Sequence, residues 1–78
     1  MQLLYIYDLK SKSKREYNRI KRVFYYRLKR FDKSKVAFKT KSVLIVQEKF
    51  EKLFDNFFKE FKGNIEVYKI HAESIEEL

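Results

Sequence analysis

Asp8 is the first residue whose type and position suggest chemistry, because it follows the apolar run Leu3-Leu4-Tyr5-Ile6-Tyr7. This run is rich in strand formers and predicts a buried, central strand, which would place the carboxylate at the rim of a sheet. A dimer axis joining two such rims would bring two carboxylates together, and Mg²⁺ takes such oxygen ligands along with waters and a phosphate. Asp8 would then be a metal ligand and a catalytic residue for phosphodiester hydrolysis. Alternatively, Asp8 caps the serine-rich turn that follows it.

Positive charge is concentrated in one part of the chain. Residues 10–41 hold fourteen of the nineteen Lys and Arg but only two of the eleven Asp and Glu, a net charge of +12, whereas the remainder carries −4. Because clustered charge creates a directed field, a polyanion is the expected partner, DNA or RNA. Phosphate contacts release counterions and give affinity without sequence readout. The candidate contact residues are Lys12, Lys14, Arg15, Arg19, Arg22 and Lys29.

Two alternatives to nucleic-acid binding apply to this basic segment. It could be an ordinary solvated helix face, although normal surfaces intersperse both signs of charge. It could also lie on an anionic membrane, but its apolar stripe is better used against a sheet, so no membrane partner is expected.

Tyrosines near the basic segment allow a second kind of contact. Tyr25 and Tyr26 lie within it, and Tyr5 and Tyr7 lie in the first strand. Such rings either stack on bases, as in RNA-binding modules, or pack in the core or at an interface.

His71 is the only histidine, and the chain has no cysteine, so a zinc site is not expected. His71 is either an exposed residue on an edge strand or, if the last strand lies beside the first, a general base near Asp8. The sequence has no glycine-rich phosphate loop and no nucleophile elbow, so covalent catalysis has no support.

The elements that would position these residues follow the order βαββαβ. Ser13 and Glu16 form a capping box, and an apolar stripe from Tyr17 to Phe31 predicts a helix after it. Apolar residues around 36–38 and 43–46 predict two short strands in a hairpin or, alternatively, one long, bent strand. Phenylalanines predict a helix over residues 47–62. Gly63 would end that helix with a positive φ, before a last strand at 65–70. This pattern predicts an α+β, ferredoxin-like sandwich in which an antiparallel sheet carries both helices on one face.

The size and composition fit one small domain. Of the 78 residues, 1–72 would form the domain and 73–78 an acidic tail, and 45% hydrophobic residues argue against disorder. Without cysteine, oligomerisation is the remaining way to reinforce so small a core. The apolar start reaches Asp8 too soon for a signal peptide or a membrane span, so a soluble cytoplasmic protein is expected.

The assembled pattern resembles the CRISPR-associated Cas-two family, the small subunit of the spacer-acquisition machinery. The opening run through Tyr7-Asp8-Leu9 matches the family's first strand, which ends in Tyr-Asp-aliphatic. The basic helix, hairpin, second amphipathic helix and last strand follow in the family's order, so the resemblance covers essentially the whole chain. The family's hairpin usually carries Ser-Val-Phe and then Gly. Here the nearest matches are Val36-Ala37-Phe38 and Ser42-Val43-Leu44, neither followed by Gly.

The resemblance implies a homodimer formed by packing sheets and exchanging C-terminal segments, although the short acidic tail here suggests that the exchanged strand is reduced or absent. It also implies binding of double-stranded DNA and partnership with an integrase subunit in CRISPR adaptation. Some family members are metal-dependent endonucleases in which the aspartate matching Asp8 binds Mg²⁺ across the dimer, and others are purely architectural.

Two other function classes fit the same residues. One is a non-catalytic basic ferredoxin-like module, such as a viral or plasmid regulator that binds nucleic acid or protein. The other is a ribonuclease toxin of the same general fold, which predicts growth arrest on expression and an adjacent antitoxin gene. An adjacent integrase gene and repeat array would favour the adaptation subunit.

Overall fold

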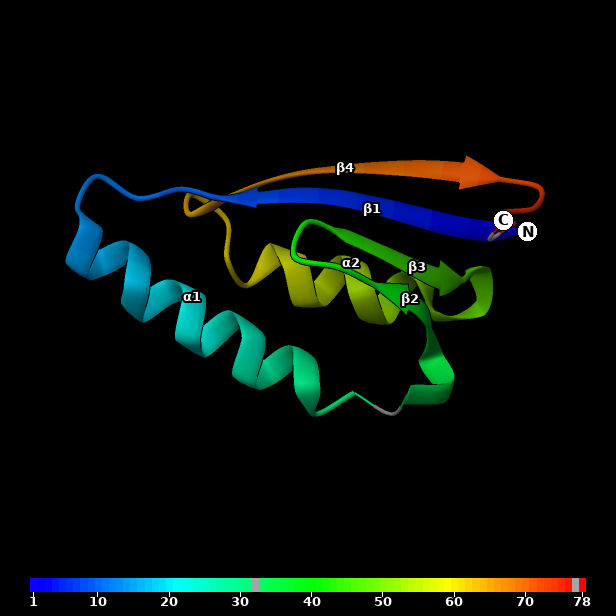
Figure 1. Ribbon diagram of the computed structural model, residues 1–78, viewed down its shortest axis with the longest axis horizontal. Coiled ribbons are helices and arrows are strands. Elements are labelled where there is room, and N and C mark those ends of the chain that lie inside the picture. Colours follow the sequence, from blue (N-terminus) through cyan, green and yellow to red (C-terminus); the bar gives the residue numbers. More distant parts are fainter. Residues whose placement is uncertain (32, 77) are drawn as a thin grey trace.

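Strands and helices follow one another in the order β1-α1-β2-β3-α2-β4 (Figure 1). The computed structural model describes residues 1–31, 33–76 and 78, and of residues 33 and 37–39 it describes the backbone alone. The strands are β1 (Gln2–Leu9), β2 (Val36–Lys39), β3 (Val43–Gln47) and β4 (Ile65–Ala72). The helices are α1 (Lys14–Lys29) and α2 (Glu51–Lys59), and short 3₁₀ turns, Lys33–Lys35 and Glu48–Phe50, precede β2 and α2.

All strand pairs in the described sheet are antiparallel, and the strand order is β2-β3-β1-β4. β1 is therefore central, as its apolar run predicts. The predicted hairpin joins β2 to β3, and the Thr40 hydroxyl holds its turn by accepting the backbone N–H groups of Ser42 at 3.2 Å and Val43 at 3.0 Å. A small α+β domain with an antiparallel sheet and two helices is thus confirmed, and it is consistent with a ferredoxin-like fold.

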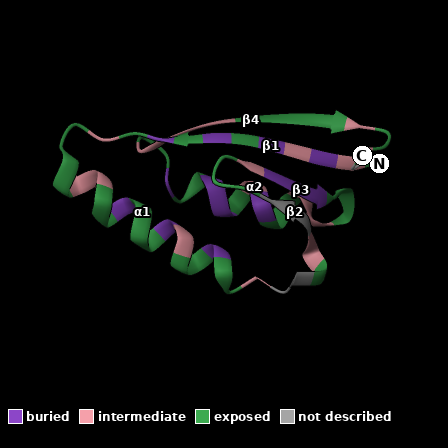
Figure 2. Cartoon of the chain, in the orientation of Figure 1, coloured by how far each residue is buried: buried purple, intermediate pink, exposed green. Residues whose placement is uncertain are grey.

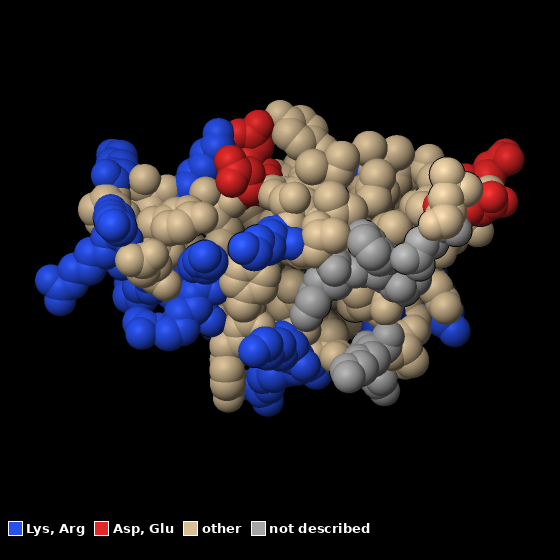
Figure 3. Space-filling view, viewed as in Figure 1, with Lys and Arg blue, Asp and Glu red and all other residues tan. Residues whose placement is uncertain are grey.

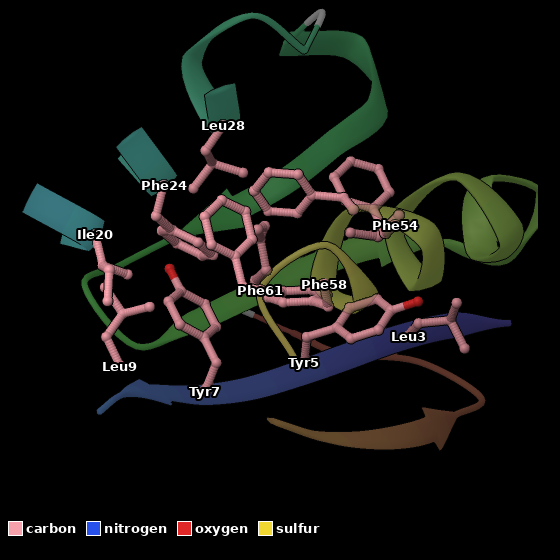
Figure 4. Close-up of a cluster of buried hydrophobic side chains, with 13 residues drawn as sticks. Leu3, Tyr5, Tyr7, Leu9, Ile20, Phe24, Leu28, Phe54, Phe58 and Phe61 are labelled. Carbon is pink, nitrogen blue, oxygen red and sulfur yellow. The ribbon is translucent and has the colours of Figure 1, made fainter. Parts of the chain in front are cut away.

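Both helices pack against the same face of the sheet, and aromatic rings fill the space between the layers (Figure 4). Phe24 of α1 is fully buried, and its ring centroid lies 5.2 Å from both that of Tyr7 in β1 and that of Phe57 in α2. Burying each large ring contributes roughly 1.5–3 kcal/mol, so these rings supply the cohesion that a disulfide gives other small domains. The remaining core residues are Leu3, Tyr5, Leu9, Ile20, Leu28, Leu44, Val46, Phe54, Phe58 and Phe61.

The helix ends agree with the sequence at some points and differ at others. The Ser13 side chain accepts the backbone N–H of Glu16 at 3.1 Å and so begins α1, as predicted. Gly63 has the predicted positive φ, 92°. However, α2 is shorter than the predicted 47–62. Gln47 pairs with Gln2 in the sheet, and a 3₁₀ turn follows it, so the helix begins only at Glu51.

β1 and β4 are both longer than predicted. β1 continues to Leu9 and β4 to Ala72, because the two strands pair over their full length. The prediction that Asp8 follows its strand is therefore wrong, since Asp8 is the penultimate residue within it.

The sheet face turned away from the helices is apolar at its centre and only partly covered (Figure 2). Ile45 on this face is 9% exposed, whereas β4 residues on it are open to solvent. Opposed residues of antiparallel strands point to the same side, and the register aligns Leu4 with Ile45 and Ile70, and Ile6 with Tyr68. Ile6, Ile70 and Tyr68 are 39%, 44% and 61% exposed. The prediction of a buried β1 is thus right for one face only.

We call this surface the outer face. It comprises Gln2, Leu4, Ile6 and Asp8 of β1 and their register partners Val43, Ile45, Gln47, Glu66, Tyr68, Ile70 and Ala72.

Candidate nucleic-acid interface and carboxylate site

The solvent side of α1 carries a continuous stripe of cations. A helix advances about 100° per residue, so Arg15, Arg19 and Arg22 share one side, opposite Ile20 and Phe24, which enter the core. Further cations extend the stripe at both ends, and every predicted phosphate-contacting residue is exposed. We call this surface the α1 basic face, defined by Lys12, Lys14, Arg15, Arg19, Arg22 and Lys29.

The α1 basic face is free of ion pairs within the described part of the chain. Arg27 on the flank of α1 pairs with Glu60, and Lys10 pairs with Glu66, but neither belongs to this face. Figure 3 shows Lys and Arg gathered over the part of the molecule where α1 lies. Acidic atoms lie at the upper edge of the view, beside other Lys and Arg, and at the end near the termini. The positive charge is therefore presented outward rather than neutralised internally. Among the described residues, no helix is long and apolar enough to cross a membrane.

Three of the four tyrosines considered as stacking residues are structural. Tyr5 and Tyr7 are in the core, and their hydroxyls donate to Asp55 Oδ1 at 2.8 Å and to the Thr40 carbonyl at 3.2 Å. Burial raises the pKa of both phenols well above the ordinary value. Tyr25 donates to the Lys41 carbonyl at 2.7 Å, which ties α1 to the hairpin turn. Tyr26 alone remains on the surface, 66% exposed.

Asp8 lies on the outer face, where its register partner is Glu66 of β4. The Asp8 side chain is exposed, and within the described residues it makes no hydrogen bond or ion pair. The predicted capping of the following turn is therefore absent, since Ser13 is the residue that caps α1. The carboxylate of Asp8 is available to an external ligand.

Three further side chains surround Asp8 and were not identified from the sequence. Lys10 and Tyr68 both donate to the Glu66 carboxylate, Tyr68 at 2.6 Å. These hydrogen bonds lower the pKa of Glu66. The same contact with Glu66 raises the pKa of Lys10, and the nearby Asp8 charge adds to that increase. We call Asp8, Lys10, Glu66 and Tyr68 the Asp8 cluster. Only the β1–β4 register reveals it, because the residues are far apart in the sequence.

The donors of the Asp8 cluster fit Mg²⁺ as part of a site. Mg²⁺ is commonly held through one or two carboxylates plus waters and substrate phosphates. Within one chain, Asp8 supplies one free carboxylate, and the described residues contain no group of three or more His, Cys, Asp or Glu placed to hold a metal. Asp8 is therefore suited to be one oxygen ligand of a site that a second chain would complete.

The α1 basic face and Asp8 lie on opposite sides of the domain. The apolar side of α1 packs under the inner face of the sheet, so its cations point away from the sheet, whereas Asp8 is on the outer face. A duplex lying along α1 would therefore not pass over Asp8 of the same chain.

His71 is far from this site. It is opposite Leu3 in the register, five positions before Asp8 along β1, or about 17 Å at the rise of a strand. Of the two alternatives for His71, the general base near Asp8 is therefore wrong. His71 is an exposed residue of the edge strand β4, with Nε2 3.6 Å from the Glu51 carboxylate.

Comparisons with known proteins give no match for this chain among protein-family models, curated proteins or solved structures.

Proposed function

We propose that this protein is a ferredoxin-like, homodimeric subunit of the CRISPR adaptation machinery that binds double-stranded DNA in the cytoplasm. The observation that carries the proposal is the α1 basic face, a line of exposed cations that form no ion pair with the described residues. A rigid row of guanidinium groups suits the regular phosphates of a duplex, since it contacts them without reading bases. The resemblance to the Cas-two family supplies the biological setting.

The outer face is the proposed dimer interface. It exposes Ile6, Tyr68 and Ile70 together, and such contiguous apolar surface is typical of interaction sites. In a two-fold dimer the same patch is used by both chains, so packing two outer faces would bury these residues against their copies. This arrangement agrees with the sheet packing that the resemblance implies.

Asp8 is the proposed Mg²⁺ ligand of a weak endonuclease activity. Because Asp8 is on the outer face, it would lie at the proposed dimer interface, where a second Asp8 would supply the missing carboxylate. A bound Mg²⁺ would polarise the phosphate and lower the pKa of a water molecule. Glu66 keeps the Lys10 ammonium beside Asp8, which limits the repulsion between two carboxylates brought close together.

We expect Ile6→Glu to break the dimer, because it would place one charge from each chain in the apolar centre of the interface. A buried, unpaired charge costs several kcal/mol, enough to convert the dimer to monomer at micromolar concentration. Sedimentation or size-exclusion chromatography with light scattering measures the mass. Val23→Glu, at an α1 residue that is also 39% exposed, is the matched control and should leave the dimer intact. A dimer that survives Ile6→Glu would place the interface elsewhere.

The adaptation role is tested by co-expression with the integrase subunit from the same genome. The expected result is a stable complex that survives purification and inserts short duplexes into a repeat array only when both proteins are present. If the chain binds duplex DNA but neither associates with an integrase nor supports insertion, the role in adaptation is wrong and a free-standing DNA-binding module remains.

A further inference from the structure

A cavity of about 260 Å³ opens between α2 and the edge strand β4, on the face of the sheet that carries the helices. Its floor is apolar. Tyr5 and Phe58, whose ring centroids are 4.9 Å apart, line it together with Ile65 and Val67 of β4. The two aromatic residues are in the core, whereas Ile65 and Val67 are only half-buried. The packing of α2 thus leaves a concave apolar surface open at this edge.

Two lysines, Lys59 and Lys62, line the cavity at the end of α2. Both are exposed, and they form no ion pair with the described residues. The backbone N–H of Lys62 donates to the carbonyl of Lys59 at 3.1 Å, and residues three apart in such a 3₁₀-type turn lie on the same side. The carbonyl end of α2 contributes only about half a negative charge nearby, so the two ammonium groups dominate. An anion between them would relieve their mutual repulsion.

The polar groups at the opposite end of the cavity are already paired with one another. Lys69 Nζ is 2.9 Å from Asp55 Oδ2 and 2.6 Å from Glu51 Oε2, and the Tyr5 hydroxyl donates to Asp55 Oδ1 at 2.8 Å. These groups need no ligand to satisfy them. The carboxylates would also repel an anion, so a negatively charged group would be held at the end of the cavity lined by Lys59 and Lys62.

We propose that this cavity binds a small amphiphilic anion, a compound with a short apolar body and one carboxylate or phosphate group. Ligand sites are mostly apolar with a few placed polar groups, and their usual volumes of roughly 300–1,000 Å³ make this one suited to a small ligand. The body would pack on Phe58, Ile65 and Val67. The anionic group would lie between Lys59 and Lys62. This inference is independent of the proposed DNA binding, because the described residues that line the cavity include none of the α1 basic face.

The test titrates octanoate and octyl phosphate into the isotope-labelled full chain and follows the backbone amide shifts by NMR. Octanol, which lacks the charge, and acetate and inorganic phosphate, which lack the apolar body, are the comparison probes. We expect octanoate or octyl phosphate to bind with a Kd at or below about 1 mM. Octanol should bind about tenfold more weakly, since two exposed ion pairs contribute about that factor together. The perturbed amides should cluster around Lys62, Ile65 and Val67, and the tighter of the two anions identifies the preferred head group.

Two variants separate the charged and apolar parts of the site. Lys59→Gln combined with Lys62→Gln should weaken binding of the anions by about tenfold and leave octanol unchanged. Lys21→Gln combined with Lys52→Gln is the matched control, because it removes the same charge from exposed lysines that do not line the cavity. This control should bind as wild type does. Val67→Phe fills the cavity and should abolish binding of every probe with an apolar body, with thermal melting by circular dichroism as the check on its fold.

Equal affinities of the wild type for octanoate, octyl phosphate and octanol would overturn the inference. An unchanged affinity for the anions in the Lys59 and Lys62 variant would also overturn it, as would failure of both anions to saturate at millimolar concentration. Amide shifts confined to the outer face, around Ile6 and Ile70, would place the binding there instead. This map is recorded on the wild type, so it decides the location even if Val67→Phe does not fold.

Discussion

Replacing Arg15, Arg19 and Arg22 together by Glu is expected to weaken duplex binding by about a hundredfold or more. Each arginine is positioned to make a charge-assisted hydrogen bond to phosphate, a contact worth roughly 1.5–3 kcal/mol, and each Glu adds repulsion. Their side chains are exposed and outside the core, so the fold should remain intact. Fluorescence anisotropy at low salt measures the affinity, and circular dichroism with thermal melting checks the fold.

A matched control separates a local surface from net charge. Lys52, Lys59 and Lys62 are also exposed, have no ion pairs with described residues and lie on or just after α2. Changing these three to Glu alters the net charge equally but spares the α1 basic face. The control should lose affinity only slightly. An equal loss in both variants would mean that overall charge, not α1, attracts the DNA.

Asp8→Asn is expected to reduce Mg²⁺-dependent cleavage by more than about a hundredfold, because the loss of residues that merely support metal ligands already costs roughly 10- to 100-fold. The amide keeps the size of the side chain but loses the negative charge that Mg²⁺ requires. Duplex affinity should be unchanged, since Asp8 and the α1 basic face lie on opposite sides of the domain. Cleavage of a labelled duplex with and without Mg²⁺ measures the effect.

Glu48→Gln is the control for the loss of one exposed carboxylate. Glu48 follows β3, where its backbone N–H reaches the carbonyl of Met1, at the end of β1 opposite Asp8. The Glu48→Gln variant should cleave the duplex at the wild-type rate. If Asp8→Asn cleaves at the wild-type rate, Asp8 is not the metal ligand, and any observed nuclease comes from another residue or from contamination.

The arrangement of elements could be predicted from the sequence because local patterns encode it. The periodicity around Phe24 and Phe54, the cap at Ser13 and the glycine at 63 each act over a few residues, and the structure confirms them. The end of a helix is less well encoded. Phe50 continues the aromatic pattern, yet sheet pairing at Gln47 delays the start of α2.

The candidate carboxylate site could be predicted only in part. Asp8 was identified because a polar residue near the end of an apolar strand stands out. Glu66 and Tyr68 could not be identified from the sequence, because their proximity to Asp8 depends on the β1–β4 register. Neither strand alone specifies that register. The same register separates His71 from Asp8. The apolar outer face could not be predicted for a similar reason. A continuous apolar run does not show that helices cover only one face of the strand.

The arginine stripe followed directly from spacing. Once the apolar positions fix which side of α1 enters the core, the cations at residues 15, 19 and 22 must share the solvent side. The exposure of Tyr26 could not be predicted from the sequence, because its neighbour Tyr25 has the same side chain. Only the structure shows that Tyr25 is packed and Tyr26 is exposed.

The salt dependence of wild-type binding to a blunt duplex tests the central claim most directly. If the cations of the α1 basic face contact phosphates, the logarithm of the association constant should fall linearly with the logarithm of salt concentration, with a slope of about −3 to −5. In the Arg15, Arg19 and Arg22 charge-reversal variant the slope should be smaller in magnitude by about three. A wild-type slope near zero, or one that the variant leaves unchanged, would contradict binding of a polyanion by this helix.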